Sequence, residues 1–208
     1  MNKAVTDGIT LMPPAFIEGL ENWSRVDGRP GDASYDGAAD AALVTADADF
    51  GDCLEIFKTE SVLKLRWFGL TAVPPGCYLR VTARVKLVGG NRPSVRIGAS
   101  AEDATGTPVT TVPAFGPEVF LENYGVPYEV TAIVGVGNRS GVDMVWGTAA
   151  TAGHLGLDLV GDNNCSVRIE DIRIEDVTSV FHRTMMDWVD VRDYGAIGDG
   201  VTDDADAF

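Results

Sequence analysis

The sequence is poor in basic residues. Lysine and arginine together number 16 against 31 aspartates and glutamates, which gives the 208-residue chain a formal net charge of −15. A protein that binds nucleic acid or an anionic membrane surface needs clustered Lys and Arg to neutralise phosphates, so neither partner is expected. Several basic residues do lie close together, but they alternate with apolar residues, and we predict that they form the solvent-exposed face of a sheet. They are Lys58, Lys64, Arg66, Arg80, Arg84 and Lys86.

Cysteine and histidine are also scarce. The three cysteines, Cys53, Cys77 and Cys165, are odd in number, lack the spacing of metal ligands and lie at or near the start of apolar runs. They are therefore predicted to be buried free thiols in a protein made in a reducing cytoplasm. His154 and His182 have no second His, Cys or acidic residue at ligand spacing, which favours hydrogen-bonded or solvated side chains. No metal ion or other cofactor is predicted.

Long hydrophobic runs are missing as well. The amino-terminal segment MNKAVTDGITLMPPAF is interrupted by Asp7, Gly8, Thr10 and two prolines, whereas a secretory signal needs about seven to fifteen apolar residues in a row. No window approaches the roughly 20 apolar residues of a membrane-spanning helix. The sequence thus predicts neither a secretory signal nor a membrane span.

Glycine, by contrast, is abundant, and it separates short apolar segments. The chain has 24 glycines and 10 prolines, a pattern that favours an all-β fold. In the clearest segment, every second residue from Cys77 to Leu87 is apolar and the residues between them are polar or charged. Such segments predict a jelly-roll-type β-sandwich over residues 50–177, with a β-bulge near Glu170 and Asp171, where the apolar parity changes. The expected strands are 53–58, 62–68, 77–88, 94–100, 128–136, 142–146, 155–160 and 166–177.

Two segments beside the sandwich are predicted to lack regular structure. Residues 1–49 have weak periodicity and predict an extended arm followed by loops, and residues 178–188 predict a linker. The apolar residues of the arm are interrupted by prolines and show no pattern for a local core. We therefore expect them to attach the chain to another subunit or to a different protein. The attachment candidates are Ile9, Leu11, Met12, Pro13, Pro14 and Phe16.

The carboxyl-terminal residues 189–208 read VDVRDYGAIGDGVTDDADAF. Valines alternating with charged residues at 189–192 predict a short strand. Three glycines then predict tight turns, because glycine adopts positive φ at little cost. Thr202 and Asp203 are good N-cap residues and Asp204 places an anion in the first turn, so a helix is expected to begin there.

This segment resembles the opening of the pectate-lyase-like, right-handed β-helix superfamily, which includes polygalacturonase-related proteins and many phage spikes. The match runs from Val191 to Asp204 without a gap. It implies that 189–208 are the first strand and the capping helix of a β-helix truncated in this chain, with Phe208 covering the apolar interior. The implied capping residues are Asp193, Tyr194, Gly195, Gly198, Asp199, Gly200, Thr202, Asp203, Asp204 and Phe208.

The aspartates of this segment could suggest a calcium site or catalytic carboxylates. A calcium loop needs six or more oxygens, and the spacing of an EF-hand is absent, so turn and cap roles are favoured for Asp199, Asp203 and Asp204. In the resembled superfamily, the acidic residues that cleave sugars lie on later coils, and no catalytic residue is therefore predicted. Asp47, Asp49 and Asp52 give a weaker indication of structural calcium, and solvation of the loop is the preferred explanation.

Two functions are compatible with these observations. The resemblance, which extends in overall pattern to β-helix proteins of gene transfer agents, implies a spike of a phage-like particle assembled in the cytoplasm. In such a homo-oligomeric spike, the arm would bind a capsid or base protein, and the missing β-helix would bind cell-surface polysaccharide. The absence of a secretory signal favours this hypothesis.

The alternative is an accessory carbohydrate-binding module of a polysaccharide-degrading β-helix enzyme. Aromatic side chains that could stack on sugar rings support it, although packing in the core is the competing explanation. The stacking candidates are Trp23, Tyr35 and Tyr124.

Overall fold

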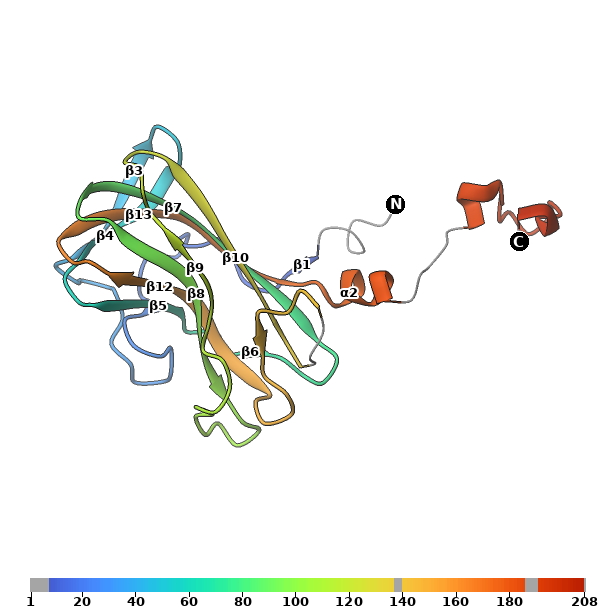
Figure 1. Cartoon of the computed structure of the whole chain (residues 1–208), viewed down its shortest axis with the longest axis horizontal. Helices are drawn as coiled ribbons and strands as arrows, with labels where there is room; N and C mark the ends of the chain where they lie inside the picture. The colour runs from blue at the N-terminus through green and yellow to red at the C-terminus, as the bar shows by residue number, and fades with distance from the viewer. Residues whose placement is uncertain (1–7, 137–139, 186–190, 208) are drawn as a thin grey trace.

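The computed structural model describes residues 8–136, 140–185 and 191–207, and their strands form two sheets packed face to face as a β-sandwich (Figure 1). The first sheet has the strand order β11-β10-β7-β13-β4-β3, with β1 also paired to β13. The second has the order β2-β5-β12-β8-β9, with β6 also paired to β12. The predicted all-β sandwich is thus confirmed.

The strands are mostly antiparallel and range from two to thirteen residues. Those of the first sheet are β1 (Ile9–Thr10), β3 (Ala41–Asp47), β4 (Gly51–Lys58), β7 (Tyr78–Gly90), β10 (Pro127–Gly135), β11 (Met144–Val145) and β13 (Cys165–Asp176). Those of the second sheet are β2 (Trp23–Ser24), β5 (Val62–Trp67), β6 (Thr71–Ala72), β8 (Pro93–Glu102), β9 (Phe115–Phe120) and β12 (Ala152–Gly161).

The core lies between the two sheets and follows the alternation of the sequence. On β7, Leu79, Val81 and Val85 are fully buried, and they face fully buried residues such as Leu65 and Leu157 in the second sheet. Burying one such side chain contributes about 1.5–3 kcal/mol to stability. The bulge predicted on β13 is confirmed by a register shift between Ile169 and Asp171 in its pairing with β7.

The three cysteines are free and buried, as the sequence predicts. Burial raises the pKa of Cys53, Cys77 and Cys165, which keeps each thiol protonated near neutral pH. No helix among the described residues is long and apolar enough to span a membrane.

The sandwich begins well before residue 50, which corrects the prediction of a separate arm. Strand β1 pairs with the end of β13, and the backbone N–H of Leu11 donates a 2.8 Å hydrogen bond to the carbonyl of Ile174. Met12 is only 7% exposed and belongs to the core, against which Phe16 also packs. The prediction fails because a two-residue strand is too short to show any periodicity. An attachment role for the exposed Ile9, Leu11, Pro13 and Pro14 stays a prediction.

The basic residues of the strands form a solvated face only in part: the side chains of Lys64, Arg80 and Arg84 are 35–38% exposed, and the prediction is wrong for the other three. Lys58, Arg66 and Lys86 are 0%, 2% and 5% exposed. Each is surrounded by oxygen acceptors, since Arg66 pairs with Asp158 and Lys86 pairs with Asp47. Alternation places Arg66 and Lys86 on the outer side of their strands, where loops and neighbouring strands cover them, whereas Lys58 shares the inward direction of Leu54 and Ile56.

The segment after the sandwich is partly helical. Helix α2 (Thr178–Met185) begins where the backbone N–H of Thr178 donates to the Asp176 carboxylate at 2.9 Å. The Phe181 ring stacks on Tyr78 with ring centroids 4.4 Å apart, so the start of the predicted linker packs against β7.

The carboxyl-terminal segment departs from the predicted strand. Val191–Tyr194 form a 3-10 helix, η1, instead of an extended strand. A second 3-10 turn, η2, spans Ala205–Ala207, and Phe208 lies outside the described residues. The strand predicted over 189–192 is thus not found at Val191 and Arg192, and the capping helix of a β-helix remains a prediction.

Candidate functional site

One face of the second sheet carries a groove of about 360 Å³, which we call the sheet groove. Its base is formed by the outward-facing side chains of β5, β12 and β8, because the alternate residues of these strands, such as Leu65, Leu157 and Ile97, point into the core. One wall comes from the loop after β2 and the other from the segment that precedes β9. The lining residues that carry its chemistry are Asp27, Arg29, Lys64, Arg66, Arg96, Ser100, Phe115 and Asp158.

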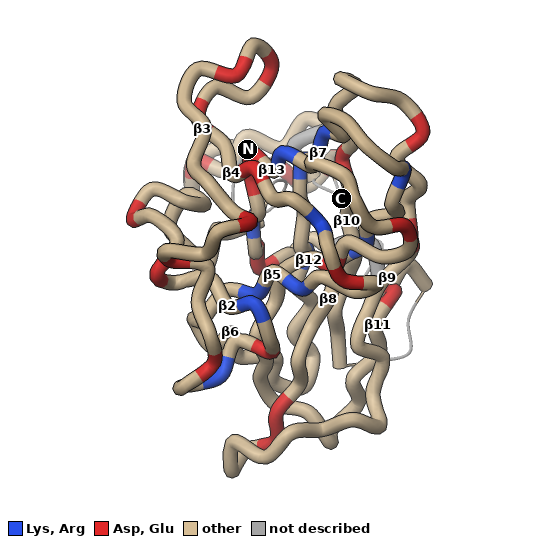
Figure 2. Tube along the Cα trace, turned by 90° about the vertical axis from the view of Figure 1, so that its left-hand side faces the viewer, with Lys and Arg blue, Asp and Glu red and all other residues tan. Residues whose placement is uncertain are grey.

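Strand register brings the charged residues of the base into one row. Asp158 on β12 lies directly between Lys64 on β5 and Arg96 on β8, and Glu118 on β9 follows Arg96. Opposite charges in neighbouring cross-strand positions attract one another, so the row is held by the sheet itself. Figure 2 shows Lys and Arg positions gathered across β5 and β8.

The central ion pair of the base is fully buried. The Arg66 and Asp158 side chains are 2% and 4% exposed, and Nη2 of Arg66 donates to Oδ1 of Asp158 at 2.6 Å. Arg66 also donates through Nη1 to the carbonyl of Leu157 at 2.7 Å. Because the charges are removed from water together, loss of either partner would leave an uncompensated charge.

Arg96 sits beside this pair and forms the edge of the groove. Its Nε lies 3.3 Å from Oδ2 of Asp158, and its guanidinium stacks over the Phe115 ring at 3.8 Å from the centroid. The Phe115 ring itself is 51% exposed. The two residues thus form a flat, partly accessible platform of an aromatic ring and a guanidinium.

Asp27 connects the opposite wall to the base. Its Oδ1 accepts hydrogen bonds from Nζ of Lys64 at 2.7 Å and from Oγ of Ser100 at 3.1 Å. Burial alone would raise the pKa of Asp27, but the hydrogen bonds from Lys64 and Ser100 outweigh it and hold the pKa below its usual range. Asp27 therefore stays ionised at neutral pH and offers an acceptor in the groove.

The chemistry of the groove suits a polyhydroxylated ligand. Guanidinium and ammonium groups donate hydrogen bonds, carboxylates accept them, and an exposed ring supplies an apolar surface. No group of three or more His, Cys, Asp or Glu in the described part of the chain is placed to hold a metal ion. Asp47 and Asp49 receive hydrogen bonds from Lys86 at 2.5 and 2.8 Å, and the loop is solvated at Asp49, which is 47% exposed, but not at Asp47, which is 2% exposed.

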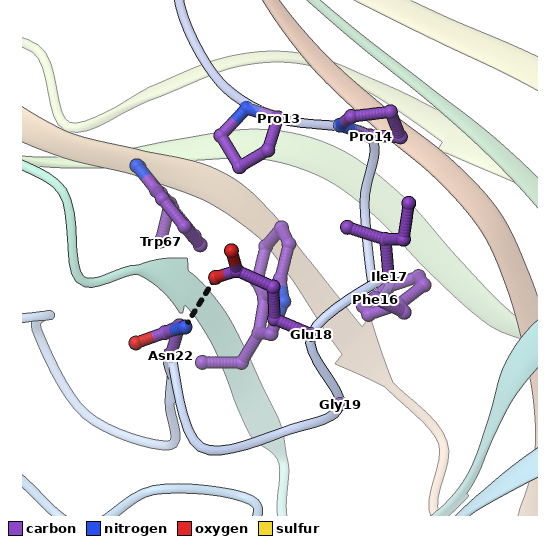
Figure 3. Close-up of a pocket in the computed structure, with 9 residues that line it drawn as sticks. Pro13, Pro14, Phe16, Ile17, Glu18, Gly19, Asn22 and Trp67 are labelled. Carbon is purple, nitrogen blue, oxygen red and sulfur yellow. Dashed lines mark hydrogen bonds between the residues drawn. The ribbon is translucent and has the colours of Figure 1, made fainter.

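A second, much smaller cleft lies between the amino-terminal segment and β5 (Figure 3). Pro13, Pro14 and Phe16, which were candidates for attachment, line it together with Trp67. Its enclosed free volume is about 10 Å³, room for one water molecule and far too little for a sugar ring.

Two of the three predicted stacking residues are buried and cannot contact a ligand. Trp23 is 1% exposed and packs between Phe16 and Trp67, with ring centroids 4.9 and 5.5 Å away. Tyr35 is also 1% exposed, and its hydroxyl donates to the Lys64 carbonyl at 2.7 Å. These predictions are wrong because both residues lie in or beside loops that fold onto the core.

Tyr124 is 46% exposed, and its stacking role stays a prediction. Its hydroxyl donates to the Gly90 carbonyl at 2.5 Å, and the Arg92 guanidinium lies 4.8 Å from its ring centroid. It is not among the residues that line the sheet groove.

The groove residues were missed in the sequence, although one signal was present. Asp158 is a lone acid in the apolar strand 155–160, and Arg66 and Lys64 are cations that flank Leu65 in the strand 62–68. An acid and a base placed in two otherwise apolar strands indicate a buried pair, but only the register shows that the strands are neighbours.

The predicted capping residues make local turns. The Asp199 carboxylate accepts hydrogen bonds from the backbone N–H groups of Val201 and Thr202 at 2.9 and 2.7 Å. Asp204 accepts from the backbone of Ile197 and Gly198 at 2.8 and 2.9 Å. The Asp203 carboxylate accepts a hydrogen bond from the backbone N–H of Ala205. The three glycines of the segment, Gly195, Gly198 and Gly200, have positive φ. Asp193 lies in η1, and Tyr194 is exposed. A capping role for them is untested.

Comparison with solved structures places the fold among carbohydrate-binding sandwiches. The chain is similar to the CBM22-1 xylan-binding domain of Paenibacillus barcinonensis Xyn10C, with 16% identity, a TM-score of 0.53 and coverage of 82% of this chain and 96% of that domain. It is also similar to the C-terminal family 22 carbohydrate-binding module of Clostridium thermocellum Xyn10B, with 12% identity, a TM-score of 0.54 and coverage of 82% and 95%. Conserved amino acids in the cleft of that module have a role in ligand binding.

These similarities show the fold, a β-sandwich like that of the xylan-binding domains. Neither a protein-family model nor a curated protein matches this chain. The comparisons do not support the hypothesis of a spike on a phage-like particle, and the alternative of an accessory carbohydrate-binding module agrees better with them.

Proposed function

We propose that this chain is a polysaccharide-binding module and that its ligand lies in the sheet groove. The observation that carries the proposal is the combination, in one groove of about 360 Å³, of the Arg96–Phe115 platform with hydrogen-bonding charged groups. The fold that it shares with xylan-binding domains supports the same conclusion.

Each part of the groove has a role in this proposal. A sugar ring packs on the exposed Phe115 surface, where its C–H groups contact the aromatic face. The hydroxyls of the sugar donate to Asp27 and accept from Lys64 and Ser100, which already form one hydrogen-bonded chain. Arg66 and Asp158 form the rigid floor under these contacts.

In the same proposal, the module is accessory to the β-helix that residues 189–208 resemble. The sandwich would hold a polysaccharide close to that domain and thereby raise the local concentration of the polymer. Within the described residues the groove carboxylates Asp27 and Asp158 are engaged by cations, which supports binding rather than acid catalysis.

Calorimetric titration of the chain with a panel of soluble plant and bacterial polysaccharides tests the proposal. Phe115→Ala is expected to weaken binding by about 0.5–1.5 kcal/mol, or roughly twofold to twelvefold, since it removes the aromatic surface. The matched control is Phe120→Ala on the same strand, because Phe120 is 54% exposed but does not line the groove. Equal loss in both variants, or no binding to any polymer, would contradict the proposal.

A further inference from the structure

The charge of the sheet groove is opposite to that of the chain. Four of the 16 lysines and arginines line it, namely Arg29, Lys64, Arg66 and Arg96, whereas only two of the 31 acidic residues do so. In the view of Figure 2, many of the acidic positions lie in the loops around the sheet. A protein of net charge −15 repels polyanions over most of its surface. The group of cations in the groove therefore sets this surface apart from the rest of the protein.

The carboxylates that line the groove number two against its four cations, Arg29, Lys64, Arg66 and Arg96. Asp27 balances Lys64, and Glu102 balances Arg29 at 2.8 Å. Asp158, however, is shared between Arg66 and Arg96. One carboxylate therefore faces two guanidiniums at the base, and the next acidic side chain, Glu118, lies 3.8 Å from Nη1 of Arg96.

Of these two guanidiniums, the accessible one is Arg96. Arg66 is buried and its side chain is committed to Asp158 and to a carbonyl, whereas the Arg96 side chain is 17% exposed. Glu118 lies 3.8 Å from Nη1 of Arg96, beyond hydrogen-bonding distance, and its own side chain is 48% exposed. The stacked guanidinium thus keeps N–H groups for another acceptor, and a guanidinium binds carboxylates in a planar, two-point geometry.

We infer that the sheet groove takes an acidic polysaccharide, whose uronate carboxylate binds Arg96 while its sugar ring packs beside it on Phe115. This inference rests on the proposed function, because it names the class of polymer that the groove prefers. Lys64 and Arg29, which are 38% and 27% exposed, extend the positive surface along the groove for neighbouring residues of the polymer. Glu118 at the rim repels the bound carboxylate and thereby limits the affinity for the acidic polysaccharide.

The test compares acidic polymers with their neutral counterparts. Polygalacturonate and alginate are titrated into the 208-residue chain, together with carboxyl-reduced forms of the same polymers and with neutral xylan, at low and high ionic strength. We expect the acidic forms to bind about tenfold more tightly than the reduced forms, since a charge-assisted contact to Arg96 is lost on reduction, and salt should narrow the difference.

Three variants locate the contact. Arg96→Gln should lose about tenfold in affinity for the acidic polymers and little for neutral ones, because it removes one charge-assisted contact. Glu118→Gln should bind the acidic polymers more tightly, since it removes a like charge. The control, Arg92→Gln, removes an arginine that also lies on an aromatic ring but outside the groove, and it should change nothing.

The outcomes separate this inference from the proposed function. Equal binding of acidic and neutral polymers, lost in Phe115→Ala, would overturn the preference for uronates and leave the polysaccharide module intact. A preference for acidic polymers that Arg96→Gln does not change would also overturn it. Binding to none of the polymers would overturn the proposed function and this inference together.

Discussion

Gly98 lies directly under the Arg66 guanidinium. A Cβ at this position would come within 2.5 Å of Nη2 of Arg66 and 2.7 Å of Oδ1 of Asp158. Gly156 on β12 is opposite Gly98 on β8 and opposite Arg66 on β5. The Arg66 side chain thus crosses two positions of the sheet that have no side chain. The buried arginine can therefore lie flat on the floor of the groove.

Gly98→Ala is expected to displace Arg66 from Asp158 and to lower the free energy of unfolding by about 1–3 kcal/mol, the usual cost of overpacking. Thermal or denaturant unfolding measures the change. Gly89→Ala is the matched control on β7, because a Cβ there meets no atom within 4 Å, and it should leave stability nearly unchanged. Similar behaviour of the two variants would show that Gly98 is not needed for the pair.

Arg66→Met should destabilise the sandwich by about 3–5 kcal/mol, because Asp158 loses its buried partner. Adding Asp158→Leu to this variant should restore part of the loss, since the buried carboxylate is then removed as well, while the partly exposed Arg96 loses its contact with Asp158. A double variant that is less stable than Arg66→Met alone would contradict this account of the floor.

Lys58→Met tests the most enclosed cation of the chain. Nζ of Lys58 donates to the carbonyls of Glu60 and Gly161 and to Oδ1 of Asn163, at 2.5, 2.8 and 2.7 Å. The variant leaves these acceptors unpaired in a buried site, and a loss of more than about 2 kcal/mol in unfolding free energy is expected. Lys64→Met is the control, because its partly exposed ion pair with Asp27 is worth about 0–1 kcal/mol.

Acid should destabilise the first sheet through Asp47. Hydrogen bonds from Lys86 and then Arg168 hold the pKa of Asp47 well below its ordinary value of 3.8. The folded state thus binds this proton less readily than the unfolded state, so the stabilisation is fully present above pH 3.8 and is lost as pH falls toward the folded pKa. Melting temperature measured against pH should fall less steeply in Asp47→Asn over that range. An unchanged slope would show that other carboxylates dominate acid unfolding.

The sequence was sufficient to predict the sandwich but not its limits. The alternation of apolar and polar residues from Cys77 to Leu87, and its shift by one residue near Glu170, show which side chains point into the core. This direction is determined by the local sequence. Strands β1 and β2 have two residues each, so their place depends on pairing partners far along the chain.

The candidate site depended even more on tertiary structure. Period-two patterns place Arg66 and Asp158 on the outer side of their strands, but the contact between them follows from register. Aromatic residues gave the opposite error, since Trp23 and Tyr35 were expected at a surface and are covered by the loops that carry them. Phe115, the ring that is exposed in the groove, lies in a strand with no clear alternation.

The most direct measurement is an NMR titration of isotope-labelled chain with an oligogalacturonate and, separately, with a xylo-oligosaccharide. If polysaccharide binds in the sheet groove, the largest shifts will fall on the backbone amides of Arg96, Ser100 and Phe115, and the Arg96 side-chain signals will move with the acidic ligand. Shifts confined to the outer face of the first sheet, or no shifts with either ligand, would contradict a polysaccharide site in this groove.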